Sequence, residues 1–187
     1  SEIAVRQGIT QLILTDINIS EEKIAIPMLL CVGAINKYLI EKKLRGYVSI
    51  NVQTGETLDT HSFATILGVG ATTINPYLAL DSLYQRYDKK LFGKLNYEEC
   101  IERYIKSINF GLLKIMSKMG ISVLSSYRGG CNFEALGLSR TIVSEYFHGV
   151  TSKISGIGLV GIEAKIKDIH KEAFQGNDNV LPIGGIY

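Results

Sequence analysis

The fold is decided by a stretch in which β-branched residues fall on alternate positions, Tyr47-Val48-Ser49-Ile50-Asn51-Val52-Gln53-Thr54-Gly55. This alternation predicts a β-strand over residues 47–54 with one buried face, and Gly55 is a suitable place for the strand to stop. The preceding apolar segment, residues 27–43, has helical spacing instead. It begins with Pro27, which suits the first turn of a helix because its missing N–H would have no partner there. A helix followed by a strand is therefore expected.

The same two patterns alternate along the rest of the chain. Short apolar runs predict further strands at residues 12–15, 72–74 and 122–125. Apolar residues at helical spacing predict helices at residues 60–67, 75–87, 97–119, 133–136, 141–147 and 161–174. Ser139 is well placed to cap the helix at 141–147. Gly111 lies inside the longest helix at a cost of about 1 kcal/mol relative to Ala, so a close helix contact or a break is expected there. Four spaced glycines near the end of the chain indicate a bent loop. They are Gly149, Gly156, Gly158 and Gly161.

Strands that alternate with helices predict parallel β–α units whose helices cover the sheet. The fold class is therefore α/β. About four strands are too few to close an eight-stranded barrel, so we expect an incomplete, TIM-barrel-like half-barrel or a small open sheet. A chain of 187 residues is long enough for a sizeable core, and no internal repeat or linker divides it. We expect residues 1–187 to form a single domain.

Charge and cysteine content exclude several classes of protein. The 20 basic and 18 acidic residues are scattered and give a net charge of +2, whereas a nucleic-acid binder concentrates its basic residues on one face. Cys31, Cys100 and Cys131 lack Cys-x-x-Cys spacing, which argues against a disulfide framework or a metal site and favours a reducing compartment. The apolar runs are too short or too broken by glycine for a membrane helix of about 20 residues. We expect neither a nucleic-acid nor a membrane partner.

Functional groups of parallel α/β folds gather at the carboxyl ends of the strands. The candidate site residues at these ends are Asp16, Asn75, Ser125, Ser126, Tyr127 and Arg128, with residues 54–56 beside them. One interpretation is a polar rim that binds a ligand or docks a neighbouring domain. The other is turn chemistry, since Asp, Asn and Ser cap helices and close loops. Arg128 suits either a bidentate grip on a carboxylate or an ion pair with an acidic residue of an adjoining domain.

Patterns for other kinds of site are weak. Gly129-Gly130 resembles a phosphate cradle, but no glycine-rich nucleotide-binding motif accompanies it. The three histidines, His61, His148 and His170, lie far apart and lack the spacing of metal ligands. We therefore predict no catalytic, cofactor-binding or metal-binding residue in this chain.

The region after the longest predicted helix resembles a known family. It reads Ser117-Lys118-Met119-Gly120-Ile121-Ser122, then Ser125-Ser126-Tyr127-Arg128-Gly129-Gly130, then Asn132-Phe133-Glu134-Ala135-Leu136-Gly137-Leu138-Ser139. This order resembles the large subunit of glutamate synthase, and within it the central domain that precedes the flavin-binding domain. Further blocks in the same order are Val5-Arg6-Gln7-Gly8, Ile26-Pro27-Met28-Leu29-Leu30, Gly68-Val69-Gly70-Ala71, Asn75-Pro76-Tyr77-Leu78-Ala79 and Gly184-Gly185-Ile186-Tyr187. The sequence departs from the family pattern at Gly130-Cys131-Asn132, where Ala-Gln-Ile is common, and at His61-Ser62, where a His pair is usual.

The resemblance implies a role within a larger enzyme. Such an enzyme hydrolyses glutamine in an amidotransferase domain, passes ammonia through a tunnel, and adds it to 2-oxoglutarate at an FMN domain to form glutamate. FMN and an iron–sulfur cluster belong to that whole enzyme, with electrons from NADPH or ferredoxin, and none of its cofactors is expected in this fragment. The family's central domain is an incomplete relative of the flavin-binding barrel. The resemblance thus implies a non-catalytic domain that couples the amidotransferase and FMN domains and contributes to the tunnel wall. It also implies a location in the cytoplasm, or in a plastid if the source is a photosynthetic eukaryote.

Two alternatives stay open at the level of sequence. One is a free-standing flavin- or phosphate-ligand-binding enzyme of the same barrel lineage, and the other is a vestigial fragment of a split gene. If the chain is a severed central domain, apolar surface that normally faces its neighbours is exposed. We then expect the fragment to self-associate or to present an apolar patch beside the strand ends.

Overall fold

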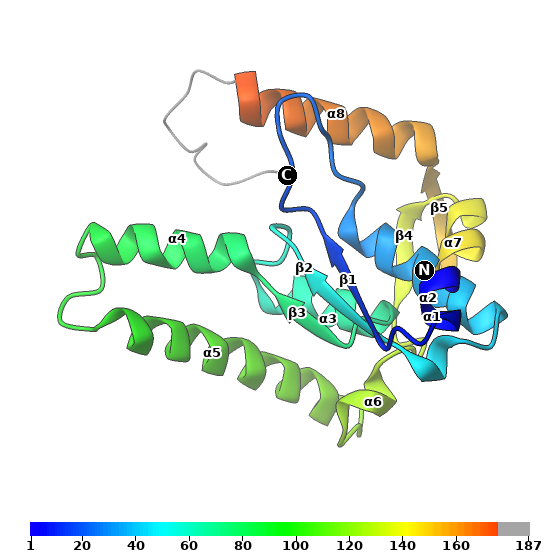
Figure 1. Cartoon of the computed structure of the whole chain (residues 1–187), viewed down its shortest axis with the longest axis horizontal. Coiled ribbons are helices and arrows are strands. Elements are labelled where there is room, and N and C mark those ends of the chain that lie inside the picture. The colour runs from blue at the N-terminus through cyan, green and yellow to red at the C-terminus, as the bar shows by residue number, and fades with distance from the viewer. Residues whose placement is uncertain (176–187) are drawn as a thin grey trace.

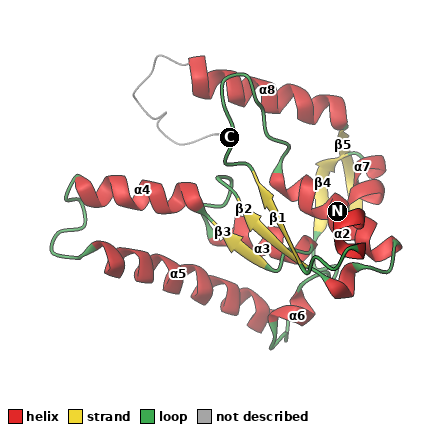
Figure 2. Cartoon of the chain, viewed as in Figure 1, coloured by secondary structure: helices red, strands yellow, loops and turns green. Residues whose placement is uncertain are grey.

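The computed structural model describes residues 1–175, in which helices alternate with strands (Figure 1). The strands of this part of the chain form two separate parallel sheets, one of three strands and one of two (Figure 2). The predicted α/β class, with parallel strands and covering helices in a partial barrel-like arrangement, is confirmed. The closing Gly184-Gly185-Ile186-Tyr187 lies outside the described residues.

The larger sheet contains, in spatial order, β1 (Gln11–Thr15), β2 (Ser49–Gln53) and β3 (Thr73–Asn75). The strands run parallel, and the register places Val52 between Leu14 and Ile74. The predictions at residues 12–15, 47–54 and 72–74 are confirmed. Because the strands are parallel, their carboxyl ends share one edge of the sheet, the carboxyl edge, and their starts share the opposite amino edge.

Long helices follow or precede these strands as the periodicity predicts. They are α2 (Met28–Glu41), α3 (Thr60–Val69), α4 (Tyr77–Asp88) and α5 (Tyr97–Lys118). Pro27 occupies the N-cap position immediately before α2. Two short elements were not predicted, the helix α1 (Glu2–Arg6) and the 3₁₀ turn η1 (Arg45–Tyr47). Of the helices within residues 1–175, none is both long and apolar enough to cross a bilayer.

One face of the larger sheet carries the core. Helices α2 and α3 pack against this face and against each other. Ile50 and Val52 of β2 point into the contact and are 0% and 2% exposed, and they meet Val32 and Leu39 of α2 there. Burying a side chain of this size stabilises a fold by about 1.5–3 kcal/mol, so this layer is the main source of stability for the sheet.

The other face of the larger sheet is polar and open. Its side chains on β1 and β3 are exposed, and those on β2 are half-buried. Two side-chain hydrogen bonds run between strands on this face, from Thr15 Oγ1 to Gln53 Oε1 at 3.0 Å and from Thr73 Oγ1 to Asn51 Oδ1 at 2.7 Å. Ile13, on the same face, is 67% exposed. Because parallel sheets are ordinarily covered on both faces, this face lacks the second layer that the architecture usually has.

The smaller sheet consists of β4 (Glu134–Leu138) and β5 (Thr151–Ile157), which run parallel and are joined by α7 (Arg140–Tyr146). The helices predicted at 141–147 and 161–174 are confirmed as α7 and α8 (Leu159–Gln175). Ser139 caps α7 as predicted, since its side chain accepts a hydrogen bond from the Ile142 N–H at 3.3 Å. The strands approach closely at one point, because a Cβ on Gly156 would lie 2.1 Å from the carbonyl oxygen of Gly137.

The strand predicted at residues 122–125 is wrong. This segment instead leads into the single helical turn α6 (Leu124–Tyr127). The reason lies in how α5 ends. Gly120 adopts φ +70°, its N–H donates to the Ser117 carbonyl at 3.1 Å, and the Ile121 N–H donates to the Met116 carbonyl at 2.9 Å. These two bonds form a Schellman cap, which turns the chain at the end of α5, and the segment after it continues into α6.

Two further predictions in the same region are wrong. Residues 133–136 were expected to be helical, because Glu, Ala and Leu are good helix formers, but Glu134 and its neighbours form β4. The spaced glycines were expected to form a bent loop, yet residues 151–157 form β5. Pairing between the two strands outweighs local preference here, and neither strand has the regular alternation by which strands are recognised in sequence.

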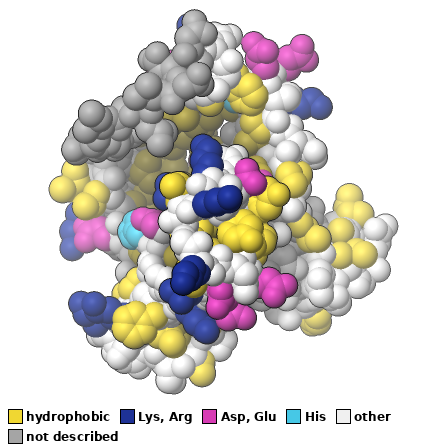
Figure 3. Space-filling view, turned by 90° about the vertical axis from the view of Figure 1, so that its left-hand side faces the viewer, with side chains coloured by type: hydrophobic (Ala, Val, Ile, Leu, Met, Phe, Trp, Pro, Cys, Tyr) yellow, Lys and Arg dark blue, Asp and Glu magenta, His cyan; other side chains and the backbone are white. Residues whose placement is uncertain are grey.

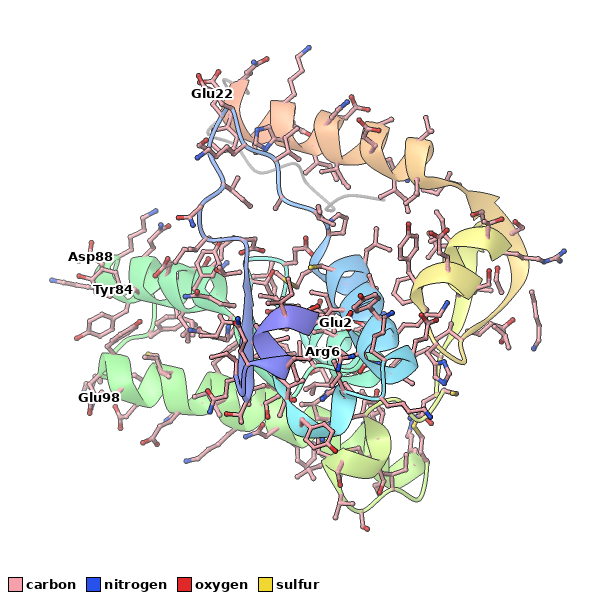
Figure 4. The ribbon with its side chains drawn as sticks, turned by 45° about the vertical axis from the view of Figure 1, so that its right-hand side comes forward. Glu2, Arg6, Glu22, Tyr84, Asp88 and Glu98 are labelled. Carbon is pink, nitrogen blue, oxygen red and sulfur yellow. The ribbon has the colours of Figure 1, made fainter. Side chains whose placement is uncertain are left out.

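Helices α4 and α5 form an antiparallel hairpin that extends away from the larger sheet (Figure 1). Figure 4 shows Tyr84, Asp88 and Glu98 at its far end. The ring of Tyr97, on α5, lies 5.4 Å from that of Tyr84 and 5.7 Å from that of Tyr87. Helix α5 is continuous through Gly111, and a Cβ there would lie 2.5 Å from the Thr60 side chain, so the expected close contact is confirmed.

Candidate functional site

The carboxyl edge of the larger sheet is tied together by hydrogen bonds to Asp16. Asp16 follows β1, is 7% exposed, and accepts hydrogen bonds from Thr54 Oγ1 at 2.5 Å and from the Gly55 N–H at 3.2 Å. The Thr54 N–H in turn donates to the Asn75 carbonyl at 3.0 Å. One connected set of hydrogen bonds therefore joins the ends of all three strands, and it compensates the burial of the Asp16 carboxylate.

Glu56 connects this edge to the start of α2. Its two carboxylate oxygens lie 3.1 and 3.0 Å from the Met28 nitrogen, whose N–H they accept at the helix N-terminus, where negative charge is favourable. The residue as a whole is exposed, but its carboxylate lies against the sheet end. Burial raises the pKa of Glu56, and the charge of Asp16 raises it further, while the bond from Met28 opposes both.

Tyr77, the first residue of α4, completes the cluster. Burial, followed by hydrogen bonding to Asp16 and the charge of that carboxylate, raises the pKa of Tyr77 to about 12. A Cβ on Gly55 would lie 3.2 Å from the Tyr77 hydroxyl oxygen, so the glycine leaves room for the ring beside the strand end.

This arrangement holds the loops at the carboxyl edge in place. Asp16 and Glu56 accept hydrogen bonds from donors of the protein itself. Burial and then the nearby charge of Glu56 raise the pKa of the half-buried Cys31 thiol. Over residues 1–175, no group of three or more His, Cys, Asp or Glu side chains is placed to hold a metal ion. The geometry at Asp16 agrees with the turn-chemistry interpretation of that residue.

The predicted site residues do not share one edge. Asp16 and Asn75 lie at the carboxyl edge, where the Asn75 side chain is exposed. Ser125, Ser126, Tyr127 and Arg128 lie at the other end of α3 instead, where Tyr127 is buried and donates its hydroxyl to the Ala64 carbonyl at 3.2 Å. The prediction that these four follow a strand is wrong because α5 is capped at Gly120 and the segment turns into α6.

Gly129-Gly130 does not form a phosphate cradle. The Gly129 N–H donates to the Gly68 carbonyl at 2.9 Å and the Gly130 N–H donates to the Tyr127 carbonyl at 3.1 Å. Both amides are thus used inside the protein, and β4 rather than a helix follows them.

Two residues at these edges, Tyr77 and Arg45, carry no site motif in the sequence. Tyr77 falls within the helix predicted at residues 75–87, and its position directly after Asn75-Pro76 is the signal that could place it beside a strand end. Arg45 lies in the turn η1 at the amino edge, and an isolated arginine in a basic loop carries no sequence pattern that distinguishes it from a solvated residue.

The described part of the chain is a parallel α/β domain whose polar edges are used to hold its own loops, and whose larger sheet is covered on one face. A sequence model described as glutamate synthase central domain matches residues 1–139. The chain belongs to this family.

Relatives match along nearly the whole chain. It is 51% identical over 187 residues to the glutamate synthase (NADPH) large chain of Azospirillum brasilense, covering 100% of this chain and 12% of that one. It is 45% identical over 177 residues to the glutamate synthase (NADPH) large chain of Bacillus subtilis, covering 94% of this chain and 11% of that one. It is 41% identical over 182 residues to the ferredoxin-dependent glutamate synthase of Pyropia yezoensis, covering 91% of this chain and 12% of that one. The chain thus spans about an eighth or less of the length of these relatives.

Proposed function

We propose that this chain is a non-catalytic part of the central domain of a glutamate synthase, where it couples the amidotransferase and FMN domains and contributes to the wall of the ammonia tunnel. The observation that carries this proposal is the family match over residues 1–139 together with relatives many times longer than the chain. The parent enzyme would convert glutamine, 2-oxoglutarate and a reductant into two molecules of glutamate, in the cytoplasm or in a plastid. Residues 1–187 would form one structural unit within it.

The open face of the larger sheet supports a docking role. A parallel sheet in an isolated protein normally carries helices on both sides, whereas here the face with Ile13 is exposed. A neighbouring domain would supply the missing layer. Contacts between domains of one chain typically bury about 600–1,500 Å², which a sheet face with its flanking loop can provide.

Apolar side chains beside β1 extend this face. Five isoleucines have between 40% and 67% of their surface exposed, namely Ile13, Ile17, Ile19, Ile24 and Ile26. A groove of about 400 Å³ lies next to them, between residues 24–30 and α8. Figure 3 shows that hydrophobic side chains also lie among charged ones on the side of the molecule where the loop between α4 and α5 is found. The exposed isoleucines beside β1, with the groove next to them, favour contact with other domains or with a second copy of the fragment, whereas charged side chains interrupt the apolar ones around the loop between α4 and α5.

The cofactors that the family resemblance implies, FMN and an iron–sulfur cluster, would be held elsewhere in the parent enzyme. Cys31 is half-buried, Cys100 is buried and Cys131 is exposed, and no metal-holding group includes them within the described residues. This part of the chain does not fit a cluster, and we assign no step of the reaction to it. The isolated chain is expected to form no glutamate from glutamine, 2-oxoglutarate and a reductant.

The experiment compares two half-reactions in the full-length enzyme. Ile13→Asp places a charge on the open face, and Leu91→Asp, at a residue that is also 67% exposed, places one on the loop between α4 and α5. Ile13→Asp should lower glutamate formation from glutamine more than formation from added ammonia, because it disturbs domain registration and not the flavin site. Leu91→Asp should change neither rate. Equal loss of both rates in Ile13→Asp, or no loss of either, would overturn the coupling role.

A further inference from the structure

The guanidinium group of Arg45 is fixed at the amino edge of the larger sheet by three hydrogen bonds. Its Nε donates to Asn36 Oδ1 at 2.7 Å, Nη1 to the Val48 carbonyl at 2.6 Å, and Nη2 to the Gly70 carbonyl at 2.8 Å. These bonds hold it half-buried between η1 and the end of α3. A guanidinium has five N–H donors, so two are left for another acceptor.

Arg128 arrives at the same place from α6. The residue after it, Gly129, donates its N–H to the Gly68 carbonyl, two residues before the Gly70 carbonyl that Arg45 binds. Arg128 is itself half-buried. Burial and then the charge of Arg128 lower the pKa of Arg45, as expected for two cations that are close together.

No carboxylate of the described residues balances this pair of charges. The five ion pairs within residues 1–175 involve Arg6, Lys37, Lys106, Lys153 and Lys167 as their cations. Arg45 binds a side-chain amide and two carbonyls, and within residues 1–175 the Arg128 guanidinium has no hydrogen-bond acceptor. Two like charges near each other and partly removed from water repel, and an anion between them would relieve the repulsion.

We propose that Arg128, with Arg45 beside it, binds a carboxylate at the amino edge of the sheet. A planar guanidinium presents parallel N–H groups that match a carboxylate bidentately. A phosphate would call for additional backbone donors, but the nearby N–H groups of Gly129 and Gly130 are already donated to Gly68 and Tyr127. The carboxylate comes either from a small carboxylic acid or from an Asp or Glu side chain in the remainder of the longer polypeptide. The site does not depend on the coupling role, because it follows from the contacts of the two arginines.

The first test measures binding of citrate to the full-length polypeptide by calorimetry at low ionic strength. Arg128→Ala should weaken citrate binding about tenfold or more, because hydrogen bonds between charged groups are the strong ones. Arg103→Ala removes the same charge from an exposed position on α5 and should leave binding unchanged. This pattern identifies a small carboxylic acid as the occupant. Arg128→Lys, which keeps the charge without the planar fork, should give an intermediate affinity.

The second test detects a carboxylate that the polypeptide supplies. The Arg128→Lys variant is treated with a carbodiimide, which joins an amine to a carboxylate in contact with it, and the linked peptides are identified by mass spectrometry. A link from position 128 to an Asp or Glu outside this chain, with no citrate binding that depends on Arg128, identifies a side chain as the occupant. A link to an acid within the chain, or neither a link nor Arg128-dependent citrate binding, would overturn the proposal.

Discussion

The two parallel sheets of this chain are held together in different ways. In the larger sheet, Ile50 and Val52 are 0% and 2% exposed beneath α2 and α3. In the smaller sheet, Leu136 and Ile154 are 66% and 63% exposed, and helix α8 contributes no buried residue. The larger sheet therefore has a core within this chain. The strands of the smaller sheet have their pairing but little apolar burial, and the buried side chains of this region, Ile142 and Val143, belong to the connecting helix α7.

The largest effect that separates the two sheets is expected from truncating a core residue. Ile50→Ala should lower the free energy of unfolding by about 2–5 kcal/mol, because it removes buried methyl groups and leaves a cavity. Ile154→Ala, at an exposed position of β5, should change it by no more than about 0.5 kcal/mol. Urea unfolding of the chain measures both. Similar losses for the two variants would show that the smaller sheet shares the main core.

The hydrogen bonds of the carboxyl edge are expected to come next. Thr54→Val keeps the shape of the side chain but removes the donor to the buried Asp16 carboxylate, and should cost about 1.5–3 kcal/mol. Thr73→Val removes a hydrogen bond to Asn51 on the open face and should cost clearly less, because water can replace it. The same unfolding measurement compares the two. Equal losses of unfolding free energy in the two variants would show that the Thr54–Asp16 hydrogen bond is no better shielded from water than the Thr73–Asn51 bond.

The close approach of β4 and β5 gives a more local effect. Gly156→Ala would push a methyl group into the Gly137 carbonyl, and the free energy of local strand opening should fall by about 1–3 kcal/mol. Gly158→Ala meets nothing within 4 Å and is the matched control. Hydrogen exchange of the β5 amides should accelerate in the first variant and not in the second, with β2 amides unchanged. Faster exchange in β2 as well would mean that the two sheets unfold as one unit.

The smallest effect concerns pH and Glu56. Because the folded state raises the pKa of this carboxyl above its ordinary value, the folded chain binds the proton more tightly than the unfolded chain. The contribution of Glu56 to stability is therefore greatest in acid and falls as the pH rises from the unfolded pKa through the folded one. Glu56→Gln should remove this fall from the pH profile of unfolding. A profile that is the same in both proteins would place the titration elsewhere.

The larger sheet was predictable from sequence because its pattern and its environment agree. Val48, Ile50 and Val52 alternate, and the structure buries all three. The smaller sheet was missed for the opposite reason. Its strands are mostly exposed, so their residues show no regular alternation. The helix-forming Glu134-Ala135-Leu136 instead pairs with residues that lie 17 or more positions away along the chain.

Only some of the candidate site residues could be placed from the sequence. Asp16 and Asn75 could be placed at strand ends because the strands themselves were predicted correctly. Arg128 was placed at the wrong edge, since the Schellman cap at Gly120 changes the course of the chain after α5. Its neighbour Arg45 comes from a segment 83 positions earlier, and a partnership between two such distant residues is set by the packing of α3 and not by any local pattern.

The ends of α5 have a consequence for how the chain folds. A capping box of Asn96 and Glu99 starts this helix of 22 residues, and the Schellman cap at Gly120 ends it. Both boundaries are set by neighbouring residues, and the helix is longer than the roughly 12–15 residues below which isolated helices are marginal. We expect α5 to form on the microsecond scale of helix formation, before the parallel strands, which must close long loops to meet. A nascent chain would then have a preformed helix against which α3 and α4 can assemble.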